Sequence, residues 1–342
     1  MEDESVKLMT DPVVSIVMPA YNAEAYIVDS IKSALNQSFH ELEVIVVDDA
    51  STDKTAHLVK QLDDPRIRLV SQNNRGQSVA INNGVECASG TYIKLLDADD
   101  WLNPTHVESQ LEAINGTQGM LASCRWGYFV NDYNKPAVRE ECTNKSYDDP
   151  FDWLVDSLSK DEGMMGGWMW LIPRSVWQKA GGFDPRLSLN NDFHFSIKLL
   201  LASDGIRYAK DAIYRYRKGT NNALSGRQGR AAMESAFMTT KLGTEQLLER
   251  ENSLRIRKVC ADRFQQWSFL FYPSYPDLFS KTEKIIHDLG GSDFNMKGGR
   301  AMQLMLPLIG WKSVRQLQRS VYKLGWKYIL QYKAKCRLKS LN

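Results

Sequence analysis

Three aspartates follow one apolar run in this sequence. The stretch YIKLLDADDW, residues 92–101, passes from mostly apolar side chains to Asp97, Asp99 and Asp100. Like charges this close repel one another, and burial would add a desolvation cost, so we expect a cation beside them. Carboxylate oxygens suit Mg²⁺ or Mn²⁺, which bind one or two protein carboxylates together with substrate phosphates. The alternative is an ordinary helix start with Asp99 or Asp100 as the cap before Pro104.

Polar residues follow four predicted strands. The first hundred residues alternate short β-rich runs with helical patterns, which predicts βαβ units and a largely parallel sheet. The predicted strands are residues 13–18, 42–47, 67–70 and 92–96. Ligands of such sheets collect outside the carboxyl ends of the strands. We therefore expect one polar rim, unless these loops are polar only because loops generally are; it would hold Tyr21, Asn22, Asp48, Asp49, Asn74, Arg75 and residues 97–100.

The composition is that of a globular protein. The chain has 342 residues, of which 43% are apolar and 25% charged, which excludes a disordered tail. Its five cysteines are scattered and form no C-x-x-C pair, so we expect neither a zinc site nor a disulfide framework. MEDESVKLMT lacks a signal pattern, and no stretch reaches the roughly 18 apolar residues of a spanning helix. We expect a cytoplasmic chain.

Several sequence blocks occur in a characteristic order: PAYNAEAYI, VVDDASTD, NNRGQSVAINNG, GTYIKLLDADDWLNP, GGFDPRL and Asn191-Asp192. This series resembles the inverting glycosyltransferases of family 2, of the bacterial surface-polysaccharide type, over about residues 13–225. The resemblance implies the α/β GT-A fold, in which a Rossmann-like, mostly parallel sheet is flanked by helices. We expect a catalytic domain at 11–228, with a nucleotide-binding half at 11–105 and an acceptor half at 106–228. The pattern beyond it predicts a mainly helical region at 229–342.

The resemblance assigns the donor site residue by residue. It places the nucleoside at Pro19, Tyr21, Asp48 and Asp49, and the nucleotide beside Asn74 and Arg75. Asp97 and Asp99 would be the D-x-D pair, with Asp99 or Asp100 on the metal. The chemistry agrees, since Tyr21 can stack on a base and an Asp can accept an imide N–H. Tyr21 could also be a packed loop aromatic.

The resemblance assigns catalysis to Asp192, the Asp of the family's Glu-Asp pair. Asn191 stands where the family commonly has Glu and cannot act as a base, so the proton-accepting role falls to Asp192 alone. A carboxylate at a helix N-terminus stays ionised but is a weaker base, and the alternative role of Asp192 is a helix cap. Arg217 and Lys218 could contact the diphosphate or form a solvated basic loop. Ile81 replaces an Arg of many relatives, which leaves that nucleotide contact open.

These assignments predict a metal-dependent hexosyltransferase. With Mn²⁺ or Mg²⁺ it would move a sugar from a nucleoside diphosphate, with UDP expected, to a hydroxyl of a glycan or lipid-linked acceptor. The alternative is a catalytically silent GT-A scaffold that binds nucleotide or glycan and recruits partners through a basic tail. A Rossmann dehydrogenase is disfavoured because no G-x-G-x-x-G follows the first strand.

The C-terminal region is basic. Residues 301–342 carry nine Lys or Arg and no Asp or Glu, which points to an anionic partner. Apolar residues recur there at three- and four-residue steps, as an interfacial helix on the inner face of a membrane would have them; they are Val314, Leu317, Val321, Leu324 and Tyr328. The alternative is a stripe that packs on the catalytic domain. Because the stripe is apolar, no nucleic acid is expected.

Overall fold

The computed structural model describes residues 12–130, 132–159, 163–219 and 229–322. These form two compact units. The first contains the described parts of Met1–Phe129, Tyr133–Arg186 and Phe195–Lys218, and the second those of Val130–Asp132, Leu187–His194 and Gly219–Asn342. The predicted boundary between residues 228 and 229 stays a prediction. None of the helices in the described ranges has the length and apolar character needed to cross a membrane.

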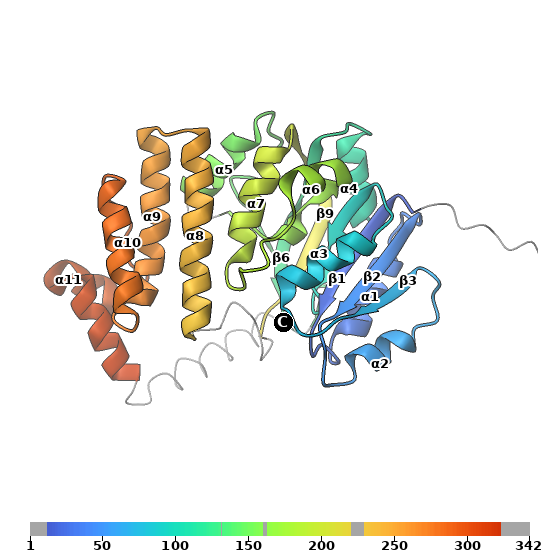
Figure 1. Cartoon of the computed structure of the whole chain (residues 1–342), viewed down its shortest axis with the longest axis horizontal. Helices are drawn as coiled ribbons and strands as arrows, with labels where there is room; N and C mark the ends of the chain where they lie inside the picture. Colours follow the sequence, from blue (N-terminus) through green and yellow to red (C-terminus); the bar gives the residue numbers. More distant parts are fainter. Residues whose placement is uncertain (1–11, 131, 160–162, 220–228, 323–342) are drawn as a thin grey trace, which may run out of the picture. The chain divides into compact units, whose positions relative to one another are not determined.

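The first unit is built on a sheet whose first half is parallel. Its strands lie in the order β3-β2-β1-β4 and match the four predicted strands. Figure 1 labels β3, β2 and β1 of this order. They are β1 (Val14–Ala20), β2 (Leu42–Asp48), β3 (Ile67–Ser71) and β4 (Tyr92–Leu95). Nearly every side chain of β1, β2 and β4 is buried, which explains their unbroken apolar runs, since helices cover both faces of a parallel sheet.

Helices α1 (Ile27–Leu35), α2 (Thr55–Lys60) and α3 (Gln77–Cys87) connect these strands. Ile27, Ile31 and Ala34 form a buried apolar face of α1. Helix α3 approaches β1 closely at Gly84, where a Cβ atom would lie 2.4 Å from Cγ1 of Val17. Ile81 of the same helix is buried, so this departure from the family pattern supplies core packing.

The second half of the sheet is mixed. It continues β4-β8-β6-β9-β5, with β7 on β6. The strands are β5 (Trp101–Leu102), β6 (Met120–Phe129), β7 (Ala137–Arg139), β8 (Leu171–Pro173) and β9 (Gly205–Arg217). The helices are α4 (His106–Ile114), α5 (Pro150–Ser159), η1 (Gly167–Met169), α6 (Arg174–Ala180) and α7 (Asn191–Ala202). Strand β9 pairs antiparallel with β5, so it runs beside the chain directly after the aspartates.

The second unit is helical, as the sequence predicts. Its helices are α8 (Arg230–Arg250), α9 (Leu254–Phe271), α10 (Pro276–Asp288) and α11 (Arg300–Val321). Helix α11 is interrupted at Gly310, whose φ of 72° and ψ of 158° are not helical. Val314 of the predicted stripe is 1% exposed and packs with Phe269 and Met296 of this unit. Leu324 and Tyr328 lie outside the described residues.

Candidate nucleotide and metal site

The parallel strands bring the predicted rim together. Ala20 is in register with Asp48, Asp48 with Ser71, and Val17 with Leu95. The loops that follow these strands therefore leave the sheet at one edge, and all belong to the first unit. The convergence expected from strand order is confirmed, although nucleotide binding there stays a prediction.

The loops after β1 and β2 are bonded to each other. The Asn22 side-chain oxygen accepts the Thr52 N–H at 2.8 Å, and the Asn22 N–H donates to Ser51 Oγ at 2.9 Å. Asn22 and Ala50 have φ of 51° and 61°, the left-handed region that tight turns require. Between these contacts Tyr21 stays 47% exposed, so its ring is accessible for stacking.

Asp49 is a loop anchor. Its carboxylate accepts from Gln72 Nε2 at 2.7 Å and from the N–H groups of Arg75 and Gly76 at 2.8 and 2.9 Å. It thereby ties the end of β2 to the start of α3, and Asn74 and Arg75 are left exposed between them. Asp48 is also buried, and its Oδ1 accepts the Ser51 N–H at 3.3 Å. Pro19 lies within β1 and is partly buried.

The three aspartates after β4 have different surroundings. Asp100 is fully buried, with Oδ2 accepting from the Tyr214 hydroxyl at 2.8 Å and Oδ1 from the Arg217 N–H at 2.7 Å. Burial, reinforced by Asp99 and Asp97, raises the pKa of Asp100 well above its ordinary value. Asp97 and Asp99 are only partly buried. The geometry thus favours Asp99 over Asp100 as the metal ligand.

Asp100, Tyr214 and Arg217 form what we term the Asp100 clasp. The Tyr214 hydroxyl also accepts the N–H of Asp97 at 3.1 Å, and Arg217 Nε donates to the Asp99 carbonyl at 2.7 Å. One strand, β9, therefore holds the turn of the D-x-D pair by side-chain and backbone contacts. These contacts orient the turn, so Asp100 serves as a positioning residue.

A buried polar layer supports the clasp. The Tyr214 ring stacks on Trp168 at 4.0 Å and meets His106 edge-on at 6.4 Å. The fully buried Lys94 donates from Nζ to the Trp168 carbonyl at 2.7 Å. Burial lowers the pKa of Lys94 to about 8 and raises that of Cys124 to about 11. A lysine inside the apolar run YIKLL is the sequence signal for this layer.

Arg217 brings positive charge to the turn. Its guanidinium lies between the rings of Tyr26 and Phe129, at 4.6 and 4.5 Å, while Nε bonds to Asp99. The cation therefore lies beside the backbone of the aspartate turn. Lys218 Nζ lies 3.7 Å from the centre of the Tyr128 ring, and burial lowers its pKa. The predicted diphosphate contacts of both residues stay predictions.

The aspartate turn fits a magnesium or manganese ion that also binds a phosphate. Asp97 and Asp99 supply hard carboxylate oxygens on a turn that β9 holds in place. Mg²⁺ typically takes one or two carboxylates and completes its shell with water and substrate phosphates. Among the residues that the structure describes, no group of three His, Cys, Asp or Glu is placed to hold a metal by itself.

Asn191 and Asp192 begin helix α7. Asn190 precedes them with a φ of 63°, and its carbonyl accepts the Phe193 N–H at 3.0 Å. Asn191 is buried and Asp192 partly buried. Residues Leu187–His194 belong to the second unit, whereas the aspartate turn belongs to the first. The assignment of Asp192 as the base stays a prediction.

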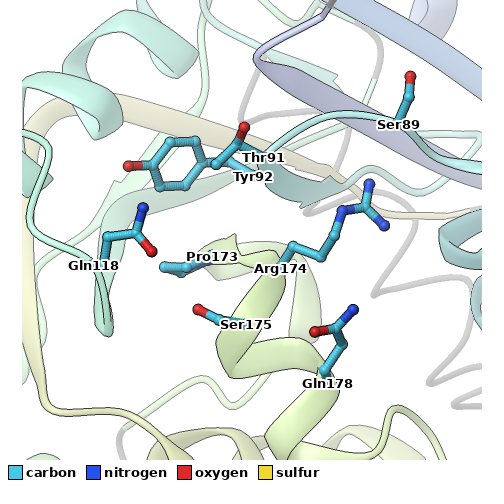
Figure 2. A pocket seen from close by; sticks show the side chains of 8 residues that line it. All are labelled: Ser89, Thr91, Tyr92, Gln118, Pro173, Arg174, Ser175 and Gln178. Carbon is cyan, nitrogen blue, oxygen red and sulfur yellow. The ribbon is translucent and has the colours of Figure 1, made fainter.

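A separate hollow of about 290 Å³ lies at the opposite edge of the sheet, at the start of β4 (Figure 2). Tyr92 and Pro173 line it together with Arg174. Arg174 Nε donates to the Gly90 carbonyl at 2.8 Å, and its own N–H donates to the Thr91 carbonyl at 2.9 Å. These contacts connect β8 and α6 to the strand before the aspartates, so they are structural.

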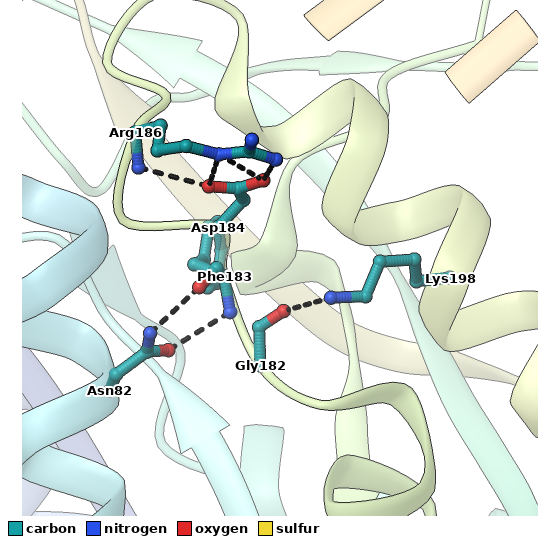
Figure 3. Close-up of polar contacts among 6 residues, drawn as sticks. All are labelled: Asn82, Gly182, Phe183, Asp184, Arg186 and Lys198. Carbon is teal, nitrogen blue, oxygen red and sulfur yellow. Dashed lines mark hydrogen bonds and ion pairs between the residues drawn. The ribbon is translucent and has the colours of Figure 1, made fainter. Parts of the chain in front are cut away.

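Asn82 of α3 clamps the GGFDPR segment, as Figure 3 shows. Its side chain donates to the Phe183 carbonyl at 2.8 Å and accepts the Phe183 N–H at 2.9 Å. Lys198 of α7 donates to the Gly182 carbonyl at 2.8 Å. Asp184 accepts the Arg186 N–H and pairs with its guanidinium at 2.6 Å, so Asp184 stabilises a turn. Sequence reasoning missed this role of Asn82.

Comparison with known proteins identifies the family. Residues 15–180 match the family model described as "Glycosyl transferase family 2". The chain is also 30% identical over 231 residues to TuaG of Bacillus subtilis (strain 168), a protein named for teichuronic acid biosynthesis, covering 66% of this chain and 87% of TuaG. The chain belongs to glycosyltransferase family 2.

Further comparisons of this family 2 chain concern another relative and the fold. It is 33% identical over 199 residues to the chondroitin synthase of Escherichia coli, covering 57% of this chain and 28% of that protein. The crystal structure of S. aureus TarS 1-349 in complex with UDP-GlcNAc aligns with a TM-score of 0.59 at 16% identity, covering 81% of this chain and 92% of that one. This likeness confirms the GT-A-like fold. The chain spans 62% or less of the first curated relatives it matches.

Proposed function

We propose that this chain is a metal-dependent, inverting glycosyltransferase that moves a hexosyl group from a UDP-sugar to a hydroxyl of a glycan or lipid-linked acceptor. The observation that carries the proposal is the aspartate turn, held by the Asp100 clasp at the edge where β1 to β4 end. Family membership supports it. So do the UDP-GlcNAc bound to TarS and the polysaccharide names of chondroitin synthase and TuaG.

The donor would lie along this edge. Tyr21 stacks on the base, beside Pro19, and Asp48 or Asp49 accepts its imide N–H, while the exposed Asn74 and Arg75 border the nucleotide. Asp97 faces the ribose or sugar. Asp99 holds Mn²⁺ or Mg²⁺, which when bound neutralises charge on the diphosphate. Arg217 and Lys218 add charge-assisted donors to the same phosphates; the residues in this donor site are Pro19, Tyr21, Asp48, Asp49, Asn74, Arg75, Asp97, Asp99, Arg217 and Lys218.

The transfer is a direct displacement. The acceptor hydroxyl oxygen forms a bond to the anomeric carbon as the bond to the diphosphate oxygen breaks, so the configuration inverts. Asp192 takes the hydroxyl proton, and the nucleoside diphosphate leaves with the bonding electron pair. Because the carboxamide of Asn191 does not accept a proton at neutral pH, Asp192 is the only base in the proposal.

The proposal also includes where the chain works. The scattered cysteines, with no C-x-x-C pair, fit a cytoplasmic protein. The basic C-terminal region fits contact with the inner face of a membrane through residues 301–342. A lipid-linked acceptor would be met at that surface.

Nucleotide titration tests the donor site. We expect one of UDP, GDP and dTDP to bind in calorimetry with Mn²⁺, UDP first, and Asp99→Ala to lose at least about tenfold in affinity because a metal-bound phosphate contact is gone. Asp211→Ala removes an exposed aspartate of β9 and is the matched control. Absence of metal-dependent nucleotide binding by the wild type would reject the proposal.

A second candidate function is a catalytically silent scaffold, which Asn191 favours because the family's Glu is missing. The two candidates differ in turnover. With a glycan acceptor, the wild type should release UDP from the donor and Asp192→Asn should not, while both bind UDP alike. Equal, background release by both proteins would support the scaffold.

A further inference from the structure

Helix α11 exposes large apolar side chains before its break at Gly310. Leu304 is 72% exposed, Leu308 80% and Ile309 48%. Such side chains, when clustered, commonly mark an interaction surface. We call Leu304 and Leu308 the α11 outer face.

The other side of the same helical segment is already used. Met302, Met305 and Leu306 pack against the cluster formed by Phe269, Met296 and Val314. Leu304 and Leu308 are four positions apart, which puts them on one stripe of the helix, away from these packed residues. The segment is therefore anchored by one side and presents leucines on the other.

The break at Gly310 separates this face from the stripe expected from the sequence. Beyond Gly310, Trp311 packs edge-on against Phe269 at 4.9 Å and Tyr272 at 5.5 Å, and Val314 is buried. The predicted stripe thus begins inside the protein. Farther along the stripe Leu317 is 44% exposed, so the most exposed apolar side chains of the described part of α11 are Leu304 and Leu308, before the break.

The segment that carries the outer face is basic. Residues 294–342 carry eleven Lys or Arg and no Asp or Glu. In the described part Lys297 and Arg300 are exposed just before the outer face, and Lys312 follows it. Lys312 pairs with Glu283 at 3.0 Å, so part of its charge is already balanced.

Resting on the membrane contact of residues 301–342 in the proposed function, we propose that the α11 outer face docks on an anionic lipid surface. Its leucines would enter the boundary between headgroups and acyl chains, and Lys297 and Arg300 would face lipid phosphates, as in interfacial helices. A second copy of the chain fits less well because it would bring two basic regions together. A nucleic acid backbone would attract the basic residues but would give the exposed leucines no apolar partner.

Vesicle flotation of the full chain tests this surface. We expect the protein to float with vesicles of equal parts phosphatidylcholine and phosphatidylglycerol, weakly with phosphatidylcholine alone, and less at high salt. The double variant Leu304→Ser/Leu308→Ser should lose at least about tenfold in partitioning, because the two leucines that would enter the lipid are replaced by polar side chains. Leu254→Ser, which alters an 86% exposed leucine of α9, is the matched control and should bind like the wild type.

A charge variant and two further readouts complete the test. Lys297→Gln/Arg300→Gln should weaken binding to the anionic vesicles while leaving the leucines in place. Thermal unfolding and UDP titration of each variant should match the wild type, which separates this surface from the donor site. Equal flotation of the Leu304→Ser/Leu308→Ser variant and the wild type would overturn the proposal. So would self-association in sedimentation, lost in that variant, without vesicle binding.

Discussion

At the scale of single residues, Tyr214 is the side chain on which the aspartate turn depends most directly. Its hydroxyl donates to Asp100 and accepts the N–H of Asp97, while its ring stacks on Trp168. Asp100 and Asp97 are close in sequence, yet their shared partner lies 117 residues from Asp97. The turn is therefore held by a contact that no local pattern contains.

The substitution Tyr214→Phe tests this positioning role. It keeps the ring but removes both hydrogen bonds, so we expect the folded state to lose about 1–3 kcal/mol, because buried polar groups lose their partner. Metal-dependent UDP affinity should fall about tenfold, while metal-independent binding changes less. Calorimetry with and without Mn²⁺ measures the difference, with Tyr208→Phe on the same strand as control. Unchanged metal dependence would show that the turn does not need the clasp.

Lys94 makes a pH-dependent contribution to stability. Burial lowers its pKa to about 8 from 10.5, so between these values the unfolded chain binds the proton more than the folded chain does. Stability should then rise with pH across that window, by up to about 3 kcal/mol from this group. Below about pH 8 the charged, buried form carries the full cost.

Comparison with Lys94→Met isolates this effect from other titrating groups. Above pH 9, its ordinary pKa, Cys124 has the opposite effect on stability, because its pKa is raised to about 11 in the folded chain. We expect the unfolding free energy of the wild type to rise relative to that of Lys94→Met as pH rises from about 8 to 10.5. Urea unfolding at a series of pH values measures it. A difference that stays constant with pH would contradict the predicted titration.

At the scale of elements, the close packing of α3 on β1 fixes the position of α3 and of the rim loop that leads into it. Helix α3 starts at Gln77, immediately after Gly76, whose N–H binds Asp49. Gly84 lets the helix lie against Val17, and Asn82 of the same helix holds Phe183. One helix thus connects the polar rim with the segment that leads toward α7.

Gly84→Ala should disturb this arrangement. The added Cβ would meet Val17 Cγ1 at 2.4 Å, so α3 must shift, and we expect a loss of about 1–3 kcal/mol in unfolding free energy. Chemical unfolding measures the loss. Gly299→Ala, where a Cβ meets nothing within 4 Å, is the control. A fully stable Gly84→Ala protein would show that the helix can move away at little cost.

At the scale of the whole molecule, charge is distributed unevenly along the chain. Residues 301–342 are basic without a single acidic side chain, while residues 1–300 carry 41 Asp or Glu against 34 Lys or Arg. Such a distribution orients a protein near an anionic surface and keeps like-charged regions apart. Combined with the α11 outer face, it suits a chain whose proposed acceptor is carried by lipid.

The sequence by itself determined which four strands are followed by polar residues. It also determined the family and the helical character of the C-terminal region. These follow from local periodicity and from motifs whose spacing is short compared with an element. The assignment of metal to Asp99 or Asp100 stayed open at that stage, as did the partner of the apolar stripe.

Tertiary structure decided the features that depend on distant partners. Asp100 is enclosed by Tyr214 and Arg217 of β9, so its oxygens are taken up, whereas Asp97 and Asp99 keep part of their surface. Beyond the break at Gly310, Val314 is buried in the core, whereas Leu304 before the break is exposed. Burial and hydrogen bonding depend on which elements meet in space, and periodicity along one segment contains no information about that.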